Sequence, residues 1–285
     1  MTTILVTGAT GTIGRATLQA LADKPGLSVK AGVRKDSFAK LPAGVAPVEL
    51  DWERPATLAP ALAGVERVLL ITPVTRNADE LVAHIVDAAR KAGVKHIVKL
   101  SAAGADAEPG IFLTRLHRAA ERAIEGSGIG FTHLRPNMFA ENLVNYWPPQ
   151  KDGNIYVPFG DSGVAYVASA DIGVAAANIL AAPDAHRGKA YFLSGPRAVG
   201  TAEVAALLAK AAGRDIRYVD VPPEAARQSM LAQQMPAWLV DGFLELFALA
   251  KAGVMSGTSP ELASLLGRAP TTLESWVEAN RNAWR

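Results

Sequence analysis

The sequence contains no cysteine among its 285 residues. Disulfide frameworks, thiolate nucleophiles, iron–sulfur clusters and cysteine-based zinc sites are therefore excluded. Of the five histidines, no two stand four residues apart, and there is no H-E-x-x-H motif. We therefore expect no metal site.

The chain also lacks an excess of charge and a long apolar run. Lysine and arginine total 29 and aspartate and glutamate 27, a net charge of +2, which gives no sign of a nucleic-acid or membrane partner. No apolar stretch approaches the ~18 residues of a membrane span. The N-terminal segment has no basic region before its short apolar run, unlike a signal peptide. We expect a soluble cytoplasmic protein.

Short apolar runs alternate with amphipathic segments through the first half of the chain. This alternation predicts an α/β fold, a doubly wound parallel sheet of the Rossmann type with helices on both faces. The expected strands are 3–6, 29–33, 47–50, 67–71, 96–100 and 131–134, and the expected helices are 15–22, 58–62, 78–91 and 113–125.

The pattern changes after Pro136 and predicts a second, smaller domain. Residues 1–136 form the expected dinucleotide-binding domain, and 164–197, with a helix at 171–180 and a strand at 190–193, are expected to return to it. Residues 137–163, read as irregular, and 198–285 form the expected substrate-binding cap, which is mostly helical. The cap helices are expected at 201–211, 223–235, 237–251, 260–266 and 271–283.

The strongest motif is a glycine-rich turn with the pattern G-x-x-G-x-x-G. Gly8, Gly11 and Gly14 follow the first strand and open the first helix. Glycine lets the backbone approach a pyrophosphate, and the helix N-terminus offers free N–H groups. The turn predicts dinucleotide binding and includes Thr10, Thr12 and Ile13. An ordinary tight strand-to-helix turn is the structural alternative.

Two cations at the end of the second strand indicate which dinucleotide is bound. Arg34 and Lys35 stand about where an NAD site carries an acidic residue. Arginine there suits the 2′-phosphate of NADP(H). A solvated strand end is the alternative, and Asp36 is a rival that favours a ribose hydroxyl.

Six segments together resemble the NmrA-like group of atypical short-chain dehydrogenases/reductases. They are GATGTIG (8–14), VRKDS (33–37), DW (51–52), LSA (100–102), LRPNMFAEN (134–142) and VASADIG (167–173). The resemblance covers nearly the whole chain. The C-terminal half is similar to the branch that contains ergot-alkaloid iminium reductases, with triphenylmethane-dye, azo-dye and type 2 quinone reductases as related members.

The resemblance implies further site residues. Asp51 and Trp52 would lie by the adenine, Thr72 and Pro73 by the cofactor ribose, and Pro136 by the nicotinamide. Ser101 would also contact the cofactor, at the position where relatives often have a substrate-contacting hydroxyl. The substrate pocket would be lined by Asn137, Met138, Phe139 and Trp147. A turn role for Asp51 and core packing for Phe139 are structural alternatives. Asp171 is expected to cap a helix N-terminus rather than to act as an acid.

The usual catalytic pair of this superfamily, Tyr-x-x-x-Lys, is missing. None of the five tyrosines has a lysine four residues later. Alignment with the family places Leu113 at the tyrosine position and His117 at the lysine position. His117 is the candidate proton donor, because its reference pKa suits neutral pH. The alternatives are a histidine on the polar face beside Arg115 and Arg118, or a partner for Glu121 four residues later.

These observations predict an NADPH-dependent reductase that transfers hydride to a conjugated or cationic small molecule. Quinones, azo or triphenylmethane dyes, imines and enones need no strong acid beside the hydride. The rival hypothesis is a non-catalytic NADP(H)-sensing regulator that binds a protein partner. A nucleotide-sugar epimerase fits poorly without the tyrosine–lysine pair. The possibility of a homodimer is left open.

Overall fold

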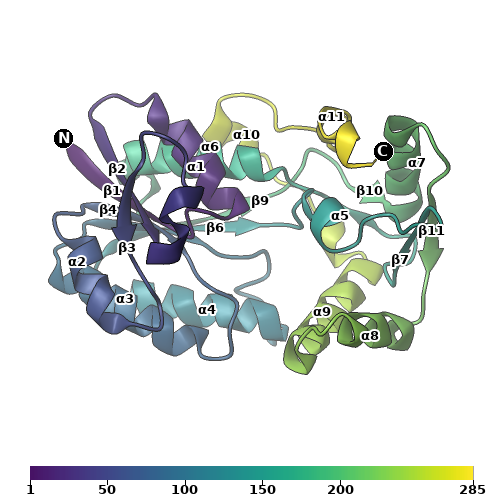
Figure 1. The fold of residues 1–285 in the computed structure, drawn as a ribbon, viewed down its shortest axis with the longest axis horizontal. Coiled ribbons are helices and arrows are strands. Elements are labelled where there is room, and N and C mark those ends of the chain that lie inside the picture. The colour runs from purple at the N-terminus through teal and green to yellow at the C-terminus, as the bar shows by residue number, and fades with distance from the viewer. Residues whose placement is uncertain (285) are drawn as a thin grey trace.

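Seven parallel strands form the central sheet of the computed structural model, which describes residues 1–284. The strand order β3-β2-β1-β4-β5-β6-β9 is the doubly wound arrangement expected from the sequence, so the predicted fold class is confirmed (Figure 1). The strands are β1 (Thr2–Thr7), β2 (Leu27–Val33), β3 (Ala46–Glu49), β4 (Arg67–Ile71), β5 (His96–Leu100), β6 (Gly130–Pro136) and β9 (Lys189–Leu193).

Helices cover both faces of this sheet, as the near-continuous apolar strands require. One face carries α1 (Thr12–Ala22) and α6 (Ser169–Ala181), which pack against each other. The other face carries α2 (Leu58–Leu62), α3 (Ala78–Lys91) and α4 (Phe112–Glu125). A separate apolar cluster fills each interface.

The carboxyl ends of β1, β4, β5 and β6 meet at one edge of the sheet. The Thr7 hydroxyl joins two of them, since it donates to the Leu69 carbonyl (3.2 Å) and accepts from the Ile71 N–H (2.8 Å). The segments that follow these strands therefore lie side by side. Ligands of open α/β sheets bind outside this edge.

The C-terminal half builds a second apolar core. Its helices include α7 (Thr201–Ala212), α8 (Pro223–Ala232), α9 (Ala237–Lys251) and α11 (Leu273–Ala279). An aromatic cluster of Trp147, Phe159 and Phe247, with ring centroids 5.3–5.8 Å apart, lies inside this core. In Figure 1 this part occupies the right-hand lobe.

The prediction that 137–163 is irregular was wrong in part. This segment contains α5 (Asn142–Asn145) and β7 (Asn154–Val157), and β7 pairs in parallel with β11 (Arg217–Asp220), a strand the sequence analysis missed. A second small sheet pairs β8 (Gly163–Val164) with β10 (Val199–Gly200). These strands are so short that their pairing depends on distant partners rather than on local pattern.

The C-terminal segment returns to the sheet through α10 (Glu261–Leu266), which packs on α6 and β9. The buried Asp171 carboxylate fastens it, accepting hydrogen bonds of 2.6 Å from the Arg268 guanidinium and the Thr271 N–H. The expected capping role of Asp171 was therefore wrong. It lies inside the first turn of α6, and Ala168 occupies the N-cap.

No helix of the described residues is both long and apolar enough to span a bilayer.

Candidate functional site

The glycine-rich turn leaves no room for side chains beside the backbone. Gly8 adopts a left-handed φ of +60°, which glycine accepts without strain. A Cβ on Gly14 would lie 2.3 Å from the Gly8 carbonyl oxygen. No side chain caps α1, whose N-cap is Gly11, and its first turn carries no acidic residue. The free N–H groups and the positive helix end fit a dinucleotide pyrophosphate.

Arg15 connects the 3₁₀ helix that follows the second strand to this turn. Its guanidinium donates to the Thr10 carbonyl (2.8 Å) and to the Lys40 carbonyl (3.0 Å). The short 3₁₀ helix Lys35–Lys40 is thereby held against the start of α1. Arg34 is exposed beside this turn, and its guanidinium lies 3.8 Å from the carboxylate of Asp36. Arg34, expected to bind the 2′-phosphate, and Asp36, the alternative ligand for a ribose hydroxyl, therefore lie side by side.

Asp51 and Trp52 have structural contacts in the turn after β3. The Asp51 carboxylate accepts from the Glu53 N–H (3.1 Å), and its own N–H donates to the Thr57 hydroxyl (3.0 Å). Trp52 is half-buried and packs against the apolar cluster under α2 and α3. Their expected place by the adenine remains a prediction.

Thr72, Pro73 and His117 meet at a small cavity of about 20 Å³. The first two follow β4, and His117 lies on α4, so a loop and a helix distant in sequence form one wall. Apolar side chains of α3 and α4, including Val82 and Leu113, complete it. Leu113, the residue that the resemblance aligns with the family's tyrosine, lies on this wall, and α4 contains no tyrosine.

Ser101 and Pro136 follow β5 and β6 at the same sheet edge. Ser101 is buried, and its hydroxyl lies close enough to the Glu121 carboxylate to help lower the pKa of that group. Pro136 is buried, and its carbonyl accepts from the Ala103 N–H (2.9 Å).

Sequence reasoning missed Lys99, the only charged residue within β5. Its side chain is fully buried, and its ammonium nitrogen contacts the Thr72 hydroxyl (3.3 Å), the Leu100 carbonyl and His117 Nδ1 (3.3 Å). Burial lowers the pKa of Lys99 to about 7. A lysine inside an apolar strand was the signal that could have identified it.

The His117 ring is less suited to donate a full proton than the sequence suggested. Burial, with the positive charge of Lys99, lowers its pKa to about 3. The imidazole is therefore neutral at pH 7. It can donate a hydrogen bond, but it does not carry an extra proton to deliver.

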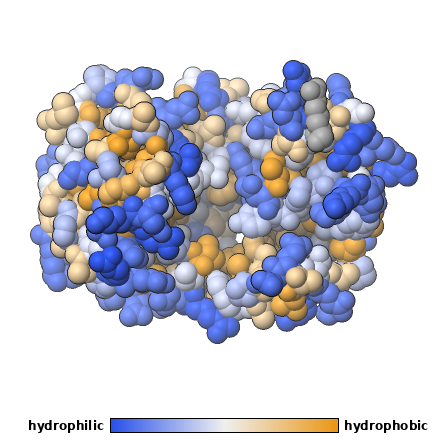
Figure 2. Space-filling view, in the orientation of Figure 1, coloured by the Kyte–Doolittle hydropathy of each residue, from blue (hydrophilic) through white to orange (hydrophobic). Residues whose placement is uncertain are grey.

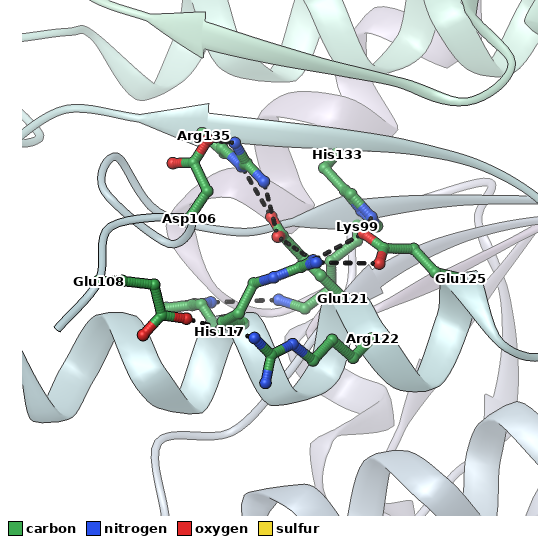
Figure 3. A network of polar contacts seen from close by, with 10 residues as sticks. Lys99, Asp106, Glu108, His117, Glu121, Arg122, Glu125, His133 and Arg135 are labelled. Atoms are coloured by element: carbon green, nitrogen blue, oxygen red, sulfur yellow. Dashed lines mark hydrogen bonds and ion pairs between the residues drawn. The ribbon is translucent and has the colours of Figure 1, made fainter. Parts of the chain in front are cut away.

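A network of ion pairs fixes α4 to β6 (Figure 3). The fully buried Glu121 receives two hydrogen bonds from Arg135, of 2.9 and 2.8 Å, and one of 3.1 Å from Arg118. Burial opposes its ionisation, but the hydrogen bonds from Arg135 prevail and lower the pKa of Glu121 to about 2. Arg135 also pairs with Asp106 (2.6 Å), so the loop before α4 is held as well.

The same network explains a cluster of possible metal ligands. The ligand atoms of Glu121, Glu125 and His133 lie within 4.8 Å of one another. Arg118 already pairs with both carboxylates, at 3.1 and 2.7 Å. The arrangement is that of an ion-pair network whose carboxylates are neutralised by arginine.

Of the four residues expected to line the substrate pocket, three have structural contacts and one lines a large cavity. The Asn137 amide donates to the Met255 carbonyl and accepts from the Met138 N–H, both at 2.9 Å, so it is occupied by main-chain contacts. Met138 is buried in the second core, and Phe139 packs partly against the first. Trp147 alone of the four lines a large cavity.

That cavity, of about 700 Å³, lies between α5, β7, α8 and α9. Its described lining contains aromatic, methionine and uncharged polar side chains and no charged residue, with Tyr146, Trp147, Phe243 and Phe247 among them. All of its lining residues belong to the second lobe, and a separate hollow lies between the two lobes (Figure 2). Such a lining suits a flat, apolar molecule.

Comparison with known proteins agrees with this geometry. Residues 8–183 match the NAD(P)H-binding family. The chain is 35% identical to the NAD(P)H azoreductase of Xenophilus azovorans, and the match covers 99% of each chain. The fold matches the NADPH complex of the quinone oxidoreductase QOR2 of Escherichia coli, with a TM-score of 0.87, 29% identity and coverage of 97% and 99%.

A third match is the NADP(H) complex of the Citrobacter sp. triphenylmethane reductase, with a TM-score of 0.83, 29% identity and coverage of 97% of this chain and 99% of the other. The glycine turn, the sheet edge and these relatives agree. The chain therefore belongs to the NAD(P)H-binding family, in the NmrA-like branch of the atypical short-chain dehydrogenases/reductases, and is an NAD(P)H-dependent oxidoreductase.

Proposed function

We propose that the protein reduces conjugated or cationic small molecules, with quinones and azo or triphenylmethane dyes as the first classes to test, and that it prefers NADPH. The observation that carries this proposal is the wall formed by α4. On this wall, Leu113 and His117 face the cavity that they share with Thr72 and Pro73. The helix offers no tyrosine hydroxyl there. The names of the relatives support the same acceptor classes.

The residues expected to hold the cofactor lie along the carboxyl edge of the sheet. The backbone of Gly8 to Gly14 would bind the pyrophosphate, and Arg34 with Lys35 would bind the 2′-phosphate. Thr72, Pro73, Ser101 and Pro136 would contact the ribose and nicotinamide. When bound, NADPH supplies the hydride.

The missing tyrosine favours acceptors that do not become strong bases. A ketone that accepts hydride becomes an alkoxide, which needs an acid at once. A quinone becomes a hydroquinone monoanion, which takes one proton from water or a weak donor, and an azo compound takes one hydride and one proton to become a hydrazine. A triarylmethyl cation takes the hydride alone. Holding the acceptor in place then provides most of the rate enhancement.

The aromatic cavity supports the same acceptor classes. Tyr146 and Phe243 lie with ring centroids 5.6 Å apart at its wall. Stacking on such rings favours flat conjugated molecules, and the uncharged lining imposes no charge preference. We propose that the aromatic part of the acceptor binds in this cavity.

The test is NADPH oxidation by purified protein with quinones, azo dyes, triphenylmethane dyes and cyclic imines, with NADH in parallel. We expect turnover with at least one class, faster with NADPH. Tight NADPH binding without turnover of any acceptor would contradict the proposal and favour the NADP(H)-sensing regulator. Sedimentation at several concentrations decides between the monomer and the homodimer that the sequence leaves open.

A further inference from the structure

The buried Lys99 ammonium has three neighbours that can accept hydrogen bonds. They are the Thr72 hydroxyl, the Leu100 carbonyl and His117 Nδ1. An ammonium group has three N–H donors and no lone pair. The number of acceptors therefore equals the number of donors, as a fully buried charge requires.

This contact fixes the tautomer of His117 while Lys99 is protonated. Because the ammonium can only donate, Nδ1 must then accept and carries no hydrogen. In a neutral imidazole the hydrogen then resides on Nε2. Nδ1 faces β5, and the ring contributes to the wall of the cavity it shares with Thr72 and Pro73. Nε2 is thus the ring nitrogen left to meet a ligand.

Few other charges act on this pair. On α4, Glu121 lies one turn after His117, and Arg115 and Arg118 flank it in sequence; Glu121 raises the pKa of His117, whereas Lys99 lowers it. The residues of α3 and of the loop after β4 that line the cavity are uncharged. The environment thus opposes a second proton on the ring.

We propose that Lys99 is a positioning residue that holds His117 as a neutral imidazole with its hydrogen on Nε2, and that this N–H donates to the acceptor's oxygen or nitrogen as negative charge develops there. The donor role rests on the proposed reductase function. It predicts a distinction among acceptors, since quinones and azo compounds gain negative charge on accepting hydride, whereas a triarylmethyl cation becomes neutral.

The tautomer is measured by NMR on protein labelled with ¹⁵N-histidine, with the His117 signals assigned by their loss in His117→Phe. At pH 6, below the pKa of about 7 of Lys99 and above that of about 3 of His117, we expect an Nε2–H tautomer in the wild type and a mixture or an Nδ1–H form in Lys99→Met. Thr72→Val, which removes another acceptor of the same ammonium, should keep the wild-type tautomer. An Nδ1–H or doubly protonated His117 in the wild type, or an unchanged tautomer in Lys99→Met, would overturn the proposal.

Kinetics test the donor role separately. Loss of one donor to a developing anion costs on the order of 10²–10³ in rate, so His117→Phe should slow quinone and azo reduction strongly and leave triarylmethyl-cation reduction nearly unchanged. Lys99→Met should slow quinone reduction by about twofold or more, since only part of the rings keep the competent tautomer. Circular dichroism and melting curves check that each variant is folded.

The double variant Lys99→Met/His117→Phe buries no unpaired amine and guards against a folding failure of the single histidine variant. It should show the same selectivity between acceptors. Equal slowing of all acceptor classes would indicate a structural role and reject the donor. If no acceptor is reduced by the wild type, the reductase proposal and the donor role both fail, whereas the NMR result still decides whether Lys99 sets the tautomer.

Discussion

Gly14→Ala tests whether the glycine turn binds the cofactor or merely allows a close crossing of backbone. The new Cβ would lie 2.3 Å from the Gly8 carbonyl oxygen and 2.7 Å from Ala9 Cα. Both neighbours are main-chain atoms, so the turn itself must move. Overpacking of this kind costs about 1–3 kcal/mol, which lowers Tm by roughly 2–12 °C at ~2–4 °C per kcal/mol.

The displaced turn should also bind NADPH less well. A hydrogen bond to a charged group contributes about 1.5–3 kcal/mol. Loss of one main-chain N–H contact to the pyrophosphate therefore raises Kd by roughly tenfold to a hundredfold. The assay is a titration of NADPH fluorescence, carried out below the Tm of the variant.

Gly195→Ala is the matched control. Its Cβ would lie 2.0 Å from the Tyr166 carbonyl oxygen, so the crowding is similar. Gly195 follows β9, four strand positions from β1, or ~19 Å at the usual strand spacing. It should lower Tm and leave the Kd for NADPH near the wild-type value. A Gly14→Ala protein that melts early yet binds NADPH normally would refute the cofactor role of the turn.

Three further predictions follow from other contacts. Arg34→Ala with Lys35→Ala should raise the Kd for NADPH more than tenfold, since a charged hydrogen bond contributes about 1.5–3 kcal/mol, and leave that for NADH nearly unchanged; equal losses would reject the 2′-phosphate site. Glu121→Gln should cost about 3–5 kcal/mol of unfolding free energy at pH 7 by denaturant titration, because it breaks a buried ion pair. The folded-state pKa of Glu121 is lowered from 4.5 to about 2, so its stabilisation is present above pH 4.5 and is lost as pH falls towards 2; a difference between variant and wild type that does not shrink over that range would contradict the assignment. Trp147→Ala should cost about 3–5 kcal/mol and raise the KM for aromatic acceptors, and an unchanged KM would place the acceptor elsewhere.

The local pattern predicted most of the sheet domain. The runs at 67–71 and 96–100 coincide with β4 and β5, and Gly8 to Gly14 open α1 as expected. These features depend on apolar periodicity and on the conformational freedom of glycine, both of which act over a few residues. The family resemblance then extended the prediction to the cofactor and to the class of reaction.

The second lobe and the polar contacts of α4 were decided only in three dimensions. β7 and β11 are separated by some sixty residues of chain and stabilise each other by pairing, so neither could be identified from its own four residues. Asp171 looked like a helix cap because a cap is a local device, but its carboxylate binds Arg268, which is far along the chain.

The sequence by itself determined the doubly wound sheet, the glycine turn and the absence of tyrosine on α4. Each of these features depends on the types and spacing of residues close together in the chain. It also singled out His117, but as an acid. Only the tertiary structure brought Lys99 within 3.3 Å of that ring and enclosed both in an apolar interface. Burial and a neighbouring positive charge keep the imidazole neutral, and those two quantities exist only after the chain has folded.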